Sequence, residues 1–181
     1  MQLLFENEKF KWINLHHPSK IDLEKIATEY NFQKLTIEDS LEPGHLPKYE
    51  SDEQSTSFLL VRFFDKERYL LKSTVREFSH KISIYIGPNF IVTVHQKETD
   101  ILTNIVAKYL NSTPPEKVTP RTILYRIVSA SIKTYGESAY KMDQEIDQLE
   151  HLIFTDDFRK IRLQTLYKIK RLKSFFSDGL K

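Results

Sequence analysis

The chain has 181 residues, 40% of them hydrophobic, and contains no cysteine. That length suits one domain or a domain with an appendage, and the lack of cysteine excludes disulfide scaffolds and thiolate metal sites. The 27 basic and 25 acidic residues leave a net charge of +2, which is too small for a strong nucleic-acid footprint.

Membrane spans and common catalytic motifs are not found in the sequence. The longest run without a charge, residues 82–96, carries Gly87-Pro88-Asn89 in its middle and is too short for a span of about 20 apolar residues. The N-terminus has no basic region before an apolar stretch, so we expect a soluble, cytosolic polypeptide without a signal peptide. The sequence contains no P-loop, GxGxxG turn, two-histidine zinc helix or GxSxG elbow. No nucleophile is paired with a base, so we expect no enzyme.

The N-terminal part predicts a strand followed by a helix. Residues 10–15 alternate like a half-buried strand, and residues 19–30 have a helical period. Ser19 and Asp22 resemble a capping box at the start of that helix. The apolar side of the helix is expected to carry Ile21, Leu23, Ile26, Ala27 and Tyr30.

A short helix and a strand meander are expected next. The helix should run over residues 36–41, where Pro43-Gly44 stops it. The following segments are rich in aromatic and β-branched residues and are separated by turn residues, which indicates a meander with at least one tight hairpin. These segments are residues 57–64, 69–80, 81–86 and 90–95.

The C-terminal part changes to a helical period. Residues 99–110 predict a helix, and the proline-rich residues 112–120 predict a stiff connector. From there an apolar heptad seam indicates a long helix. The seam consists of Tyr125, Val128, Ile132, Tyr135, Ala139, Met142, Ile146, Leu149 and Ile153.

A second helix is expected to fold back on the first. Residues 155–157 offer an N-cap, and residues 158–176 carry another apolar stripe. Residues 137–157 hold seven acids against one lysine, whereas residues 159–173 hold seven bases and no acid. The short break and the opposite charges predict an antiparallel helical hairpin.

These elements predict an α/β fold with α+β layering. A mixed sheet flanked by helices should form a body over residues 1–111, with residues 112–120 as the connector. The long antiparallel helical hairpin should occupy residues 121–181.

The order of several short motifs resembles the cytosolic domain of CorA-type divalent-cation transporters. The motifs are Trp12-Ile13-Asn14-Leu15, Leu35-Thr36-Ile37-Glu38-Asp39, Pro47-Lys48-Tyr49-Glu50, the strand at 90–95 and the acidic stretch at 142–150. The match runs from Phe10 to about Phe176. Each motif is a few residues long, and their ordered succession carries the resemblance.

The resemblance implies a regulatory, cation-sensing part of a homopentameric, channel-like magnesium transporter. In that family an α/β domain and a helical hairpin lie at the cytoplasmic face of the bacterial inner membrane. A stalk helix and two membrane helices with a Gly-Met-Asn signature follow, and they lie beyond Lys181 if the chain has them. The chain would reach the membrane only through those C-terminal helices. Ser129 and Lys133-Thr134 replace acids found in some relatives, which argues against a second regulatory site.

The resemblance also implies a regulatory metal half-site at Asp39, with Glu38 beside it. Mg²⁺ keeps several waters and is satisfied by one or two carboxylates, so the second acid would come from an adjoining subunit. Cation binding would stabilise the closed pentamer. The transported or sensed ion is expected to be Mg²⁺, with Co²⁺, Ni²⁺ or Zn²⁺ as alternatives. A simpler interpretation is that two acids at the start of a short helix are solvated and favoured by its dipole.

A rival hypothesis is a soluble α/β adaptor whose charged hairpin binds protein or nucleic acid. The basic residues 159–173 could hold phosphate. Because they alternate with an apolar stripe and face an acidic helix, charge pairing is favoured and no nucleic-acid partner is expected. The histidines show no partner in the sequence, His45 among them.

Overall fold

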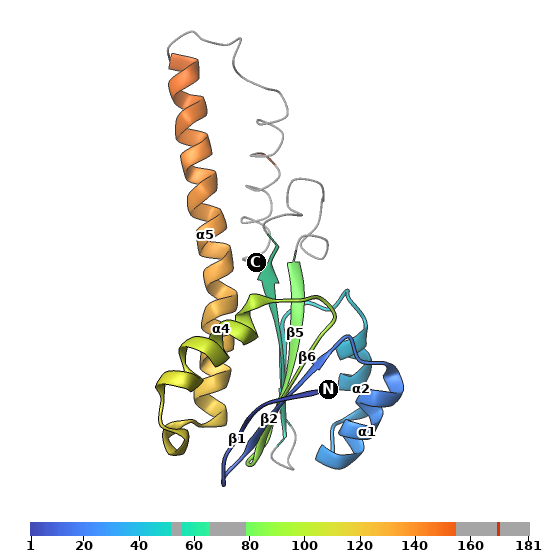
Figure 1. Ribbon diagram of the computed structural model, residues 1–181. Helices are drawn as coiled ribbons and strands as arrows, with labels where there is room; N and C mark the ends of the chain where they lie inside the picture. Colours follow the sequence, from blue (N-terminus) through green and yellow to red (C-terminus); the bar gives the residue numbers. More distant parts are fainter. Residues whose placement is uncertain (52–55, 66–78, 155–169, 171–181) are drawn as a thin grey trace. The chain divides into compact units, whose positions relative to one another are not determined.

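The computed structural model describes residues 1–51, 56–65, 79–154 and 170. Six strands form a mixed sheet in the order β1-β2-β6-β5-β4-β3 (Figure 1). The strands are β1 (Gln2–Glu6), β2 (Lys11–His16), β3 (Lys48–Ser51), β4 (Ser57–Phe64), β5 (Ser79–Ile86) and β6 (Phe90–His95). The helices are α1 (Lys20–Tyr30), α2 (Lys34–Leu41), α4 (Asp100–Lys108) and α5 (Pro120–Phe154), with 3₁₀ turns η1 (Leu110–Ser112) and η2 (Pro115–Lys117).

The contacts within the chain group into two compact units. One consists of Met1–Phe63 and His80–Ile132, and the other of Phe64–Ser79 and Lys133–Lys181. The first unit contains most of the sheet, α1, α2, α4 and the beginning of α5. The predicted connector, residues 112–120, lies within this first unit. The predicted second hairpin helix, residues 158–176, lies outside the described residues except for residue 170.

Parallel pairing of β2 with β6 makes the sheet mixed. Trp12 faces Ile91 and Leu15 faces Val94 in this register, whereas β1 with β2, β3 with β4 and β5 with β6 pair in the antiparallel sense. The predicted tight turn connects β5 and β6, where the Gly87 N–H donates to the carbonyl of Phe90 at 3.0 Å. A Cβ added at Gly87 would lie 2.3 Å from Cε1 of Phe90, so this turn needs glycine for the close approach of the ring.

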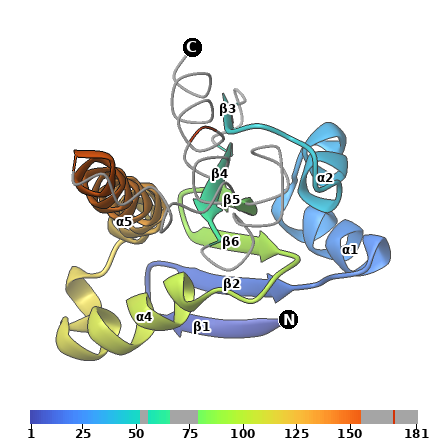
Figure 2. The ribbon, with the colours of Figure 1, turned by 90° about the horizontal axis from the view of Figure 1, so that it is seen from above.

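Helices cover both faces of the sheet within the first unit (Figure 2). Successive strand residues point to opposite faces, and they divide the core in two. One cluster joins the sheet to α1 and α2 through residues such as Leu23, Ile26 and Ile37. The other joins it to α4 and α5 through residues such as Ile105, Ile123 and Ile127. The predicted fold class, a mixed sheet flanked by helices, is confirmed.

The capping signal predicted the start of the first helix correctly, but one residue expected on its apolar side is exposed. The Ser19 hydroxyl accepts from the Asp22 N–H at 3.2 Å, and the Ser19 N–H donates to the Asp22 carboxylate at 3.3 Å, which completes the capping box. Leu23 and Ile26 are buried as expected, but Ile21 is 65% exposed. Ile21 lies in the first turn, ahead of the residues that reach the sheet.

Two strands were not expected, and one expected break is absent. Strands β1 and β3, which lie at the edges of the sheet, were not predicted. The predicted separation between residues 69–80 and 81–86 is wrong at its boundary, since β5 is continuous from Ser79 to Ile86. The remainder of the first segment, residues 69–78, lies outside the described residues.

The prediction of a buried heptad seam is wrong for the beginning of α5. Tyr125 and Ile132 are 71% and 65% exposed, whereas Ile123 and Ile127 are fully buried and Ser131 is nearly so. The buried set recurs at steps of four, the spacing of a helix face against a flat surface. The sheet therefore selects a stripe different from the coiled-coil seam. Farther along the helix, Leu149 is buried.

The second unit joins the end of β4 to the later part of α5. The Phe64 N–H donates to the Thr134 hydroxyl at 2.8 Å. The Phe64 ring meets the Tyr135 ring edge-on, with centroids 5.9 Å apart. Aromatic pairs favour this geometry, and it gives Tyr135, a predicted seam residue, a partner.

Candidate functional site

Helix α2 places the two predicted site residues differently. Asp39 is 8% exposed, whereas Glu38 lies on the exposed side of the helix. The helix begins at Lys34 and ends at Leu41, so both acids lie in its second half. The interpretation of favourable acids at a helix start is therefore wrong, because the carbonyl end of a helix disfavours negative charge. Asp39 needs compensating cations.

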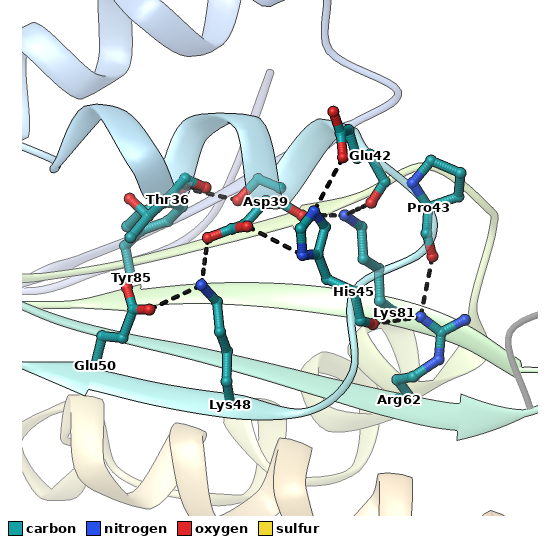
Figure 3. Close-up of polar contacts among 11 residues, drawn as sticks. Thr36, Asp39, Glu42, Pro43, His45, Lys48, Glu50, Arg62, Lys81 and Tyr85 are labelled. Carbon is teal, nitrogen blue, oxygen red and sulfur yellow. Dashed lines mark hydrogen bonds and ion pairs between the residues drawn. The ribbon is translucent and has the colours of Figure 1, made fainter.

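The carboxylate of Asp39 has partners at both oxygens (Figure 3). Lys48 donates from Nζ to Oδ2, and His45 Nδ1 lies 3.1 Å from Oδ1. The same ammonium donates to Glu50 at 2.8 Å, and the other His45 nitrogen lies 3.1 Å from a Glu42 oxygen. Lys48 and Glu50 are two residues apart on β3, which places them on the same face of the strand.

Two buried cations hold the end of α2 and the loop that follows it. Lys81 on β5 is 5% exposed and donates to the carbonyls of Asp39 and Glu42. Arg62 on β4 is 4% exposed and donates to the carbonyls of Pro43 and His45 at 3.1 and 2.8 Å. The last carbonyls of a helix have no partner within the helix. Cationic donors satisfy them and complement the helix dipole.

Burial and neighbouring charges shift the pKa values of these groups in opposite directions. Hydrogen bonds to Asp39 and Glu50 raise the pKa of Lys48 above its usual value. Burial, with a further contribution from Arg62, lowers the pKa of Lys81 to about 8. Lys48 therefore stays protonated, whereas Lys81 loses its proton at mildly alkaline pH.

A buried tyrosine fixes the first half of α2 against the sheet. The Tyr85 hydroxyl donates to the Thr36 carbonyl at 2.7 Å and lies 2.7 Å from the Ser40 hydroxyl. Its ring stacks on Phe32 with centroids 3.7 Å apart. Burial raises the pKa of Tyr85 to about 12, so the phenol stays a donor. Asp39 is therefore presented from a well-anchored helix.

The residues around Asp39 do not form a complete metal site within one chain. In the described part of the chain, no group of three or more histidine, aspartate or glutamate side chains is placed to hold a metal ion. Carboxylate oxygens suit Mg²⁺, but both oxygens of Asp39 are engaged. A cation at Asp39 would therefore share the carboxylate with these partners or replace one of them.

Sequence reasoning found Asp39 but missed the side chains around it. His45 has two carboxylate partners where the sequence showed none. Arg62 and Lys81 each stand alone in an apolar strand, in Ser57–Phe64 and Ser79–Ile86. A single charge in a buried strand is the signal that could have identified them, because it requires a buried partner.

Comparison with known proteins identifies the family. The family model described as "CorA-like Mg2+ transporter protein" matches residues 7–175. The chain belongs to this CorA-like family. YfjQ of Bacillus subtilis (strain 168), named as a candidate metal ion transporter, is 22% identical over 139 residues, which are 77% of this chain and 41% of YfjQ.

Two solved structures illustrate the fold that the chain shares with known proteins. The complete CorA magnesium transporter from Methanocaldococcus jannaschii matches with a TM-score of 0.66 and 19% identity over 94% of this chain. The cytoplasmic domain of ZntB from Vibrio parahaemolyticus matches with a TM-score of 0.61 and 10% identity over 91% of this chain. At these identities the likeness shows the fold.

The CorA-like chain spans only part of these relatives. It covers 41% of YfjQ, 50% of the complete CorA chain and 65% of the ZntB domain. None of the helices in the described residues is long and apolar enough to span a bilayer.

Proposed function

We propose that this chain is the cytosolic, cation-sensing part of a divalent-cation transporter and that it regulates transport without being an enzyme. Membership of the CorA-like family over residues 7–175 supports this assignment. The parent protein would be a homopentamer in the bacterial inner membrane, and this part of it would lie at the cytoplasmic face. Membrane helices following Lys181 would form its pore.

Asp39 is proposed as the regulatory half-site, with Glu38 beside it. The observation that carries this assignment is a nearly buried carboxylate at the end of α2, next to an exposed one. One or two carboxylates suffice for Mg²⁺ when waters complete its shell. An acid from the neighbouring subunit would supply the second ligand. Cation binding would then favour the closed assembly by its differential affinity for that state.

Mg²⁺ is the proposed ion, with Co²⁺, Ni²⁺ and Zn²⁺ as alternatives. The oxygen atoms of Asp39 and Glu38 suit the hard magnesium ion. The imidazole of His45, 3.1 Å from Asp39, would suit the softer cations. The choice between them therefore depends on whether His45 or a water completes the site.

The proposed domain organisation has three parts. Residues 1–111 would be the α/β body, residues 112–120 the connector and residues 121–181 an antiparallel helical hairpin. The described part of α5 would be the acidic helix of that hairpin, with Glu145 and Glu150 among its acids. The basic residues 159–173 would lie along it.

A transport assay tests the proposal. Reading the gene beyond the codon for Lys181 should give a long helix and two apolar segments of about 20 residues each. Proteoliposomes with that parent protein should take up Mg²⁺, and millimolar Mg²⁺ on the cytosolic side should inhibit uptake. Asp39→Asn should weaken the inhibition and leave uptake at low cytosolic Mg²⁺ unchanged.

Glu6→Gln is a suitable control because it removes a carboxylate paired with Lys11 on the sheet edge. This variant should keep the inhibition of the wild type. A stop codon directly after Lys181, or wild-type inhibition in Asp39→Asn, would refute the proposed function.

A further inference from the structure

Lys48 places its ammonium against the carboxylate of Asp39. Its ammonium lies between two carboxylates, donating to Asp39 Oδ2 and, at 2.8 Å, to Glu50 Oε1. The same nitrogen lies 5.6 Å from the centre of the Phe58 ring, within cation–π range. The lysine side chain is 31% exposed and that of Asp39 is 11% exposed. Asp39 and Lys48 therefore form an ion pair that is partly accessible to solvent.

We infer that Lys48 is an internal competitor of the divalent cation, so that the ammonium and the cation exchange for the carboxylate of Asp39. This inference rests on the proposed function, in which Asp39 binds the cation. It adds that the cation concentration to which the protein responds is set by a lysine in the same chain.

Lys48 is better suited to this exchange than the other cations nearby. Lys81 donates to the backbone carbonyl of Asp39 and not to its carboxylate, so a cation on the carboxylate leaves that bond intact. Arg62 bonds to the carbonyls of Pro43 and His45. His45 Nδ1 lies 3.1 Å from Oδ1, whereas Lys48 donates to Oδ2. Lys48 therefore carries the positive charge that a cation at Oδ2 must replace.

The exchange leaves no unpaired charge behind. When Asp39 turns to a cation, Lys48 keeps its bond to Glu50, whose side chain is 40% exposed. The ammonium is also able to regain water at its exposed side. Release is therefore less costly than for a fully buried pair, in which the remaining charge would be unpaired.

The pair also links two elements of the fold. Asp39 lies on α2 and Lys48 is the first residue of β3, an edge strand paired only with β4 in the sheet order. Exchange of the ammonium for a cation would release this edge strand from α2. Cation binding at Asp39 would thus loosen the contact between α2 and β3.

The expected effect follows from the fraction of time that Asp39 is available. An apparent dissociation constant is the intrinsic constant divided by the fraction of molecules competent to bind. If the ion pair is formed in at least about nine molecules out of ten, removing the ammonium should lower the half-saturating Mg²⁺ concentration at least about tenfold.

The experiment is a titration of the assembled parent protein in proteoliposomes with cytosolic Mg²⁺, because the proposed site needs an acid of the neighbouring subunit. Total ionic strength is held constant by KCl. The cytosolic Mg²⁺ concentration that half-inhibits uptake is measured for the wild type, Lys48→Met, Asp39→Asn, and Lys48→Met combined with Asp39→Asn. Lys34→Met is the matched control. Lys34 is exposed on α2, the helix that carries Asp39, and its loss changes the net charge by the same amount as the loss of Lys48. The half-inhibiting concentration should fall at least about tenfold in Lys48→Met and not in Lys34→Met, and the inhibition should be weakened in the double variant.

Equal half-inhibiting concentrations in Lys48→Met and Lys34→Met, with weakened inhibition in Asp39→Asn, would overturn the competition and leave the proposed site standing. No Mg²⁺ response in any variant would overturn both. Should Lys48→Met fail to fold, nitrogen-15 NMR of the wild-type lysine ammonium groups decides. Mg²⁺ should shift the Lys48 signal and leave that of Lys81 in place, and an unchanged Lys48 signal would overturn the inference.

Discussion

Raising the pH from 8 to 9.5 should stabilise the protein through Lys81. Burial and Arg62 lower the pKa of this lysine from 10.5 to about 8. Between these two values the unfolded chain binds a proton that the folded chain does not. The free energy of unfolding therefore rises with pH across this interval.

The size of the effect follows from the two pKa values. For one group titrating at 10.5 when unfolded and near 8 when folded, the rise between pH 8 and 9.5 is about 1.5 kcal/mol. Measurements should stop at pH 9.5, because Tyr85, with its pKa raised to about 12, contributes in the opposite direction above pH 10.

Urea unfolding followed by circular dichroism at half-unit pH steps measures the rise. Lys81→Met should remove it, because methionine has a similar shape and no titrating group. Arg62→Met is the matched control, since a guanidinium does not titrate in this range. That variant should keep a smaller rise, because the neighbouring cation that lowers the pKa of Lys81 is gone. An equal rise in the wild type and in Lys81→Met would refute the reasoning.

Three further predictions test the packing around the site. Tyr85→Phe keeps the ring stack and loses two buried hydrogen bonds to α2, so urea titration should show a loss of about 1 to 3 kcal/mol. Ile127→Ala empties a fully buried position and should cost about 2 to 5 kcal/mol, whereas Tyr125→Ala on the exposed side should stay within about 0.5 kcal/mol; equal losses would contradict the assigned face of α5. Ser19→Ala removes a capping box and should lower the thermal midpoint by the equivalent of about 1 kcal/mol, while a gain in stability would contradict that role.

The sequence by itself determined the elements whose signals are local. Ser19 and Asp22 are three residues apart, so the capping box needs only its own helix turn. The turn at Gly87 is set by its neighbours. The half-buried strand expected at residues 10–15 is wrong in its burial, because Trp12, Ile13 and Leu15 are all buried. The family resemblance likewise rests on short motifs in order, and the match over residues 7–175 confirms it.

The tertiary structure decided which face of α5 is buried and which groups surround Asp39. Both apolar stripes of α5 are compatible with a helix, and only the sheet selects Ile123 and Ile127 over Tyr125. Lys81 lies 42 residues from Asp39 in the chain, and no local pattern joins them. A buried charge must find its partner wherever the fold brings one within hydrogen-bond reach, and that proximity is a property of the folded sheet and helix together.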